Sequence, residues 1–157
     1  MFISPVALIW ILLISSVLHI AEEFLRPGGF FREYRIMMKA IGLDARPRDM
    51  VFINTLFLSA VVSTVIALPA SYFWALSVIS LTTVNGILHI GKTIQQKKYF
   101  PGLATALLLY LPLGIVSFFV LPLPATAKLL AALTGIGLHA VPFLILLVRR
   151  FRKKKAG

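Results

Sequence analysis

The sequence predicts an all-α, polytopic membrane protein, a single membrane-embedded domain over residues 1–157 with five transmembrane helices. Hydrophobic residues make up 59% and charged residues 13% of the chain, whereas soluble domains average roughly 45–50% and 25%. In addition, five apolar stretches reach about 20 residues, the length needed to cross a bilayer core. A soluble globular domain is excluded, because too few polar side chains remain to cover a water-facing surface.

The five apolar stretches cover residues 4–25, 50–68, 72–91, 102–121 and 125–148. Helix-breaking residues mark their boundaries: Pro69 separates the second from the third, Pro101 and Gly102 precede the fourth, and Pro122 and Pro124 follow it. Because the number of spans is odd, we expect the two termini on opposite sides of the membrane.

The Lys and Arg residues predict which side is which. Apart from Lys128, every one of them lies in residues 26–48, in residues 92–98 or in the basic tail 149–157. Five spans put these three segments on one side, and positively charged loops stay in the cytoplasm. We therefore expect an outside N-terminus and a cytoplasmic C-terminus, in the plasma (inner) membrane of a prokaryote. The net charge of +11 then reflects membrane topology, and no nucleic-acid partner is expected.

Residues 29–42 join the first two spans and predict a helix on the inner leaflet. Its apolar positions recur at helical spacing and its charged positions take the other face: Phe30, Phe31, Tyr34, Met37, Met38 and Ile41 against Arg32, Glu33, Arg35 and Lys39. This pattern is typical of a helix lying in the membrane interface. Two roles remain open, an anchor on anionic headgroups and a lid over a substrate.

The ionisable residues within the spans are the candidate functional residues, because burying such groups in a membrane is costly. All three histidines, His19, His89 and His139, fall within predicted spans, as do Glu22 and Glu23. The chain has no Cys, so a bound metal would take His and carboxylate ligands.

Helical geometry brings several of these residues together. His19, Glu22 and Glu23 share one sector of the first span, with the two carboxylates about 100° apart around the axis. The alternative is a structural cluster at the membrane interface, neutralised by Arg26 and Arg32. At about 1.5 Å per residue, His19, His89 and His139 all fall in the cytoplasmic half of their spans. We expect one polar pocket that opens toward the cytoplasm.

Three short motifs occur in order along the chain. They are HxxEE at residues 19–23, an Asn and a His four apart at Asn85 and His89, and YxPG at residues 99–102. Together they resemble the HXXEE-domain family of small integral membrane proteins, over nearly the whole chain. That family has no established activity, so the resemblance implies a catalytic or metal-binding site at these motifs and leaves the reaction open.

Three imidazoles and two carboxylates suit a tetrahedral zinc with one open position or a non-haem iron. We expect a divalent transition metal, with zinc favoured and iron possible, held by His19, Glu22, Glu23, His89 and His139. The function favoured is hydrolysis of a lipid or other apolar substrate from the bilayer.

Further roles follow from this hypothesis. Glu22 or Glu23 serves as base or ligand, Asn85 as an orienting group or oxyanion donor, and Tyr99 as a group on the substrate side. The alternatives are a non-haem iron oxidoreductase, a haem-binding membrane protein and a proton-coupled transporter. The outer half of the spans offers mainly hydroxyls, which argues against a conduit across both leaflets.

Overall fold

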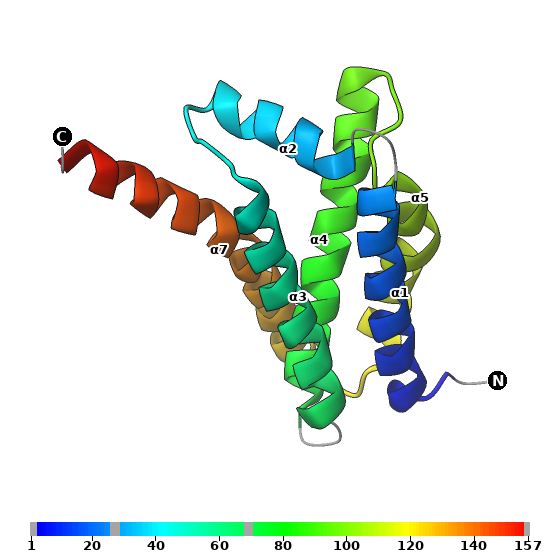
Figure 1. Ribbon diagram of the computed structural model, residues 1–157. Coiled ribbons are helices and arrows are strands. Elements are labelled where there is room, and N and C mark those ends of the chain that lie inside the picture. Colours follow the sequence, from blue (N-terminus) through cyan, green and yellow to red (C-terminus); the bar gives the residue numbers. More distant parts are fainter. Residues whose placement is uncertain (1–2, 26–28, 68–70, 156–157) are drawn as a thin grey trace.

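The computed structural model describes residues 3–25, 29–67 and 71–155, with side chains as far as Phe151. The predicted roles of Arg26 and Pro69, and the end of the basic tail, lie outside these described side chains. Every element within the described residues is helical (Figure 1). In chain order they are α1 (Pro5–Leu25), α2 (Gly29–Ala40), α3 (Pro47–Ala67), α4 (Tyr72–Gln96), α5 (Leu103–Thr105), the π-helical turn η1 (Ala106–Tyr110), α6 (Leu111–Val120) and α7 (Ala125–Lys155).

Within the described residues, five helices are long and apolar enough to cross a bilayer. They are Pro5–Leu25, Pro47–Ala67, Tyr72–Gln96, Leu103–Val120 and Ala125–Phe151. These agree with the five predicted spans to within a few residues, so the predicted all-α fold with five candidate spans is confirmed. The chain is an integral membrane protein by this criterion, while its orientation stays a prediction.

Helix α4 lies at the centre of the bundle and contacts each of the other spans. The core of the bundle contains Leu12, Val61, Ile79 and Ala131, all with 0% exposure. Helix α7 approaches α4 closely at Gly135, where an added Cβ would lie 2.6 Å from the Ser77 carbonyl oxygen. The absence of a side chain there allows the two backbones to meet, as is common between membrane helices.

The fourth span is continuous but irregular at the end that follows the YxPG motif, where α5 passes through η1 into α6. Pro112 is the second residue of α6 and has no N–H to donate to a carbonyl one turn earlier. The N–H of Leu111, directly after η1, bonds the Ala106 oxygen, five residues back. Such π-turns are frequent at functional sites, and this one carries Tyr110 into the interior, where it has 0% exposure.

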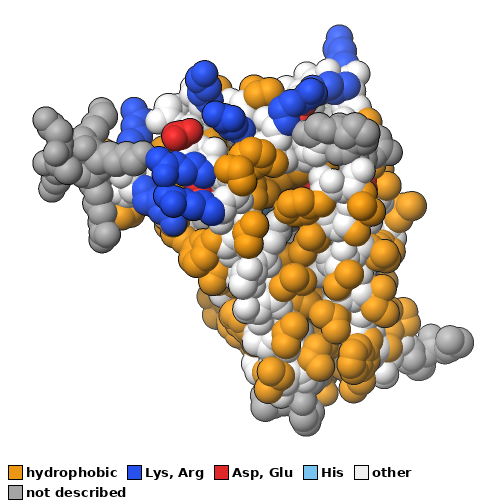
Figure 2. All heavy atoms as spheres, in the orientation of Figure 1, with side chains coloured by type: hydrophobic (Ala, Val, Ile, Leu, Met, Phe, Trp, Pro, Cys, Tyr) orange, Lys and Arg blue, Asp and Glu red, His pale blue; other side chains and the backbone are white. Residues whose placement is uncertain are grey.

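Helix α2 lies across the ends of the spans (Figure 1). A second apolar cluster fixes it there, formed by Tyr34, Met38, Leu43, Met50 and Leu146. Figure 2 shows Lys, Arg, Asp and Glu side chains gathered at this end, whereas hydrophobic side chains cover the flanks of the bundle. A helix is thus present at the predicted position, and its location on the inner leaflet stays a prediction.

Candidate metal centre

His19, Glu23 and His89 form a buried group at the end of the bundle that α2 covers. Helix α1 supplies His19 and Glu23 one turn apart, and α4 supplies His89. Glu23 Oε1 lies 3.4 Å from His19 Nε2 and 3.3 Å from His89 Nε2. The ligand atoms of all three lie within 4.8 Å of one another, so the group could hold a metal ion. Two ligands bound to zinc at about 2.0–2.1 Å in tetrahedral geometry would lie about 3.3 Å apart, which matches the two separations between Glu23 and the histidines.

The second nitrogen of His89 is fixed by the YxPG loop. Its Nδ1 donates a hydrogen bond to the Pro101 carbonyl oxygen, and a carbonyl can only accept. The proton of a neutral His89 therefore sits on Nδ1, which leaves a lone pair at Nε2 directed toward Glu23. Metal-binding histidines typically have this arrangement, with the outer N–H held by a carbonyl or carboxylate.

The second nitrogen of His19 is fixed through Thr105. The Thr105 hydroxyl donates to Glu22 Oε2 at 2.6 Å and lies 2.7 Å from His19 Nδ1. Because the hydroxyl proton is used on Glu22, Thr105 accepts the proton of His19 Nδ1. A neutral His19 consequently has its lone pair at Nε2, where it accepts a hydrogen bond from Asn85 Nδ2 at 2.9 Å. A metal bound at His19 Nε2 would take the place of this hydrogen bond.

The group therefore combines three electron-pair donors in a buried space. The side chains of His19, Glu23 and His89 are only 2%, 5% and 2% exposed, so water contributes little to their solvation. The His19 lone pair has a donor in Asn85, whereas the His89 lone pair and the Glu23 carboxylate, 3.3 Å apart, repel one another unless a cation lies between them. The donor set fits a divalent transition metal, and a proton shared within the group is the alternative.

Glu22 lies outside this group, although it belongs to the same motif. Its carboxylate accepts hydrogen bonds from the backbone N–H groups of Gly102, Ala104 and Thr105 and from the hydroxyls of Thr105 and Tyr99. These backbone groups open the fourth span, where free N–H groups favour a negative charge. Glu22 thus joins α1 to the start of the fourth span and supports His19 through Thr105.

Gly102 allows the YxPG loop to approach both imidazoles. Its φ of +93° is in the left-handed region that favours glycine. A Cβ at this position would lie 2.5 Å from His89 Nδ1 and 2.7 Å from His19 Cε1. The YxPG motif therefore contributes the Pro101 carbonyl and the Tyr99 hydroxyl to the site, and Gly102 lets its backbone lie close to both imidazoles.

The chain that carries these three motifs also matches a known protein family. The family described as protein of unknown function with HXXEE motif matches residues 10–117. The chain belongs to the HXXEE family. No curated protein and no solved structure matches the chain. In this HXXEE protein the residues of the HXXEE motif have two different environments. His19 and Glu23 belong to the ligand group, whereas Glu22 forms hydrogen bonds with the YxPG loop.

The other predicted site residues are distributed around the ligand group. Asn85 contacts His19, whereas Tyr99 donates to Glu22. His139 is half-buried on α7, and the structure does not bring it into the ligand group. The structure thus brings together three of the five residues predicted as metal ligands.

Sequence reasoning missed two residues of the site. Thr105 has no distinctive signal, because a hydroxyl in the first turn of a helix is common at helix starts. Tyr110 packs its ring 4.6 Å from that of His19, a contact that depends on the π-turn.

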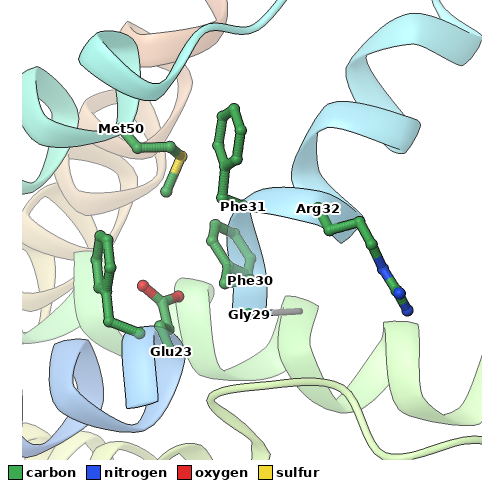
Figure 3. Close-up of a pocket in the computed structure, with 7 residues that line it drawn as sticks. Glu23, Gly29, Phe30, Phe31, Arg32 and Met50 are labelled. Atoms are coloured by element: carbon green, nitrogen blue, oxygen red, sulfur yellow. The ribbon is translucent and has the colours of Figure 1, made fainter. Parts of the chain in front are cut away.

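A pocket of about 280 Å³ adjoins the ligand group. It is lined by Glu23, Phe24, Gly29, Phe30, Phe31, Arg32 and Met50, from α1, α2 and α3. In Figure 3 the Glu23 carboxylate points toward the space between Phe30 and Met50, and Arg32 points away from it. Phe30 also lies over His89, with ring centroids 5.3 Å apart. Glu23 of the ligand group thus lines a pocket between α1, α2 and α3.

Proposed function

We propose that this HXXEE protein is a membrane-embedded, metal-dependent hydrolase that acts on a lipid or other apolar substrate. The observation that carries the proposal is the convergence of His19, Glu23 and His89 at metal-ligand spacing, with both Nδ1 atoms directed outward. Two His and one Glu with an open position is a ligand set used by catalytic zinc. The apolar pocket at Glu23 supports the substrate class.

A bound divalent ion would supply Lewis-acid polarisation of the substrate and a water of lowered pKa. In the hydrolysis, water adds across an ester or amide bond and releases a carboxylic acid and an alcohol or amine. The surrounding residues keep the ligand atoms in position: Pro101 and Thr105 orient the two imidazoles, and Asn85 lies beside His19 Nε2. Glu22 already accepts five hydrogen bonds, so we assign it a positioning role and not that of a base.

A non-haem iron oxidoreductase is the second candidate. The favouring observation is that the group has two His and one carboxylate, the ligand set of non-haem iron oxygenases. The identity of the metal separates the two candidates, because zinc has no redox chemistry.

Metal content, measured by mass spectrometry on detergent-purified protein, tests the proposal. We expect near-stoichiometric zinc or iron in the wild type, and its loss in Glu23→Gln and His89→Ala. His139→Ala is the matched control, because it removes a histidine of a neighbouring helix outside the ligand group, and it should retain the metal. Freshly purified wild type without metal, or a folded Glu23→Gln with unchanged metal content, would contradict the proposal.

A further inference from the structure

Four of the seven described residues that line the pocket beside Glu23 have large apolar side chains. Phe24, Phe30, Phe31 and Met50 line it from three different helices. Among the lining residues that the structure describes, Glu23 and Arg32 carry charge, and Arg32 points away from the space in Figure 3. A small polar substrate would have few partners in such a pocket, whereas a hydrocarbon chain would replace water at apolar walls.

The pocket opens at the boundary between the apolar flank and the charged end of the bundle. Its walls are the last turn of α1, the first turn of α2 and the first turn of α3. Phe24 lines the pocket and is still 53% exposed, and Val51, the neighbour of Met50, is 62% exposed. A molecule in the bilayer therefore meets the pocket from the side, at the level where the hydrophobic surface of Figure 2 gives way to Lys and Arg.

Charge selects the orientation of such a molecule. The side chains of Arg32 and Lys98 are 69% and 52% exposed at the rim of the pocket. Both form ion pairs with Glu33. An anionic headgroup is favoured at this basic rim. With the headgroup held at the rim, the part of the molecule that reaches Glu23 is the part next to the hydrocarbon chain.

We propose that the pocket binds the hydrocarbon chain of an anionic, single-chain amphiphile, with a neutral ester or amide group at Glu23 and the headgroup at Arg32. This substrate class rests on the proposed hydrolytic function at His19, Glu23 and His89. The amphiphile reaches the site laterally from the lipid, beneath α2. Phe30 and Phe31 form the roof of the chain-binding space, and Met50 forms its wall on α3.

Binding of a fluorescent, ether-linked lysophosphatidylglycerol to the full chain in detergent tests this inference, since the ether cannot be hydrolysed. Met50→Trp fills the pocket, and Val51→Trp is the matched control, because it adds the same ring at the neighbouring lipid-facing position. We expect saturable binding to the wild type and to Val51→Trp. Met50→Trp should weaken binding roughly tenfold or more, the equivalent of about two buried methylene groups. A second probe with a zwitterionic choline headgroup should bind more weakly than the anionic one.

Two further measurements make the result decisive. Phe31→Ala removes part of the roof without adding bulk, and it should also weaken binding. It provides the test of the pocket if Met50→Trp fails to fold. Metal content is measured on the same samples and should be unchanged in all three variants. Loss of binding in the pocket variants without any metal in the wild type would support the pocket and refute the metal site. A folded, metal-containing Met50→Trp that binds the probe like the wild type would overturn the inference.

Discussion

Replacing Gly102 by Ala tests the account of the YxPG loop directly. The backbone at φ +93° is strained for any residue with a Cβ, which costs about 1–3 kcal/mol of unfolding free energy. The new Cβ would also lie 2.5 Å from His89 Nδ1 and 2.7 Å from His19 Cε1. Both rings must move, and the hydrogen bond from His89 to the Pro101 carbonyl is lost with that movement.

We expect Gly102→Ala to lower metal affinity by roughly 10–100-fold, the usual effect of disturbing groups that orient metal ligands. Metal titration calorimetry and thermal unfolding of the purified protein measure the two effects. Gly91→Ala is the matched control, because Gly91 lies on α4 near His89 and an added Cβ there meets nothing within 4 Å. It should stabilise the helix by about 0.5–1 kcal/mol and leave metal affinity unchanged. A folded Gly102→Ala with wild-type metal affinity would refute the reasoning.

Two other perturbations follow from the contacts around the site. Thr105→Val removes the hydroxyl between His19 and Glu22 and should reduce metal affinity roughly 10–100-fold, whereas Thr134→Val, at an exposed hydroxyl bonded within its own helix, should not change it. For α2, the Lys98 ammonium holds the pKa of Glu33 below its ordinary value of 4.5. Because the pKa is lowered in the folded state, the stabilisation is present above about pH 4.5 and is lost as the pH falls through the folded value. The hydrogen-exchange protection factors of α2, which correct for the slower intrinsic exchange of amides at low pH, should therefore fall on acidification, and Lys98→Gln should remove most of this pH dependence.

Much of the fold could be predicted from the sequence because a lipid solvent imposes simple length and polarity rules. About 20 apolar residues make a span, and the prolines at 69, 101, 122 and 124 interrupt the apolar pattern. The π-turn before Pro112 was not predicted. Pro112 removes one backbone donor there, but the π-turn also accompanies the burial of Tyr110 in the interior, a tertiary contact that the local sequence does not encode.

The candidate site could be predicted only in part. Helical spacing brings His19 and Glu23 to one face, and the 100° between the two carboxylates explains why Glu22 faces a different partner. Depth along a span placed His139 at a suitable level, but depth carries no information on which side of α7 faces the ligand group. The contribution of Gly102 depends on a backbone angle and on a tertiary approach, which sequence spacing does not encode.

The tie between Glu22 and the start of the fourth span also bears on how the protein is made. Helix α1 leaves the ribosome first, yet the backbone donors for its carboxylate follow 80 to 83 residues later. At about 5–20 residues per second, the carboxylate waits roughly 4–16 seconds for these partners. We expect the end of α1 that carries Glu22 to stay hydrated at the membrane surface during that interval and to settle into the bundle only once the fourth span has inserted.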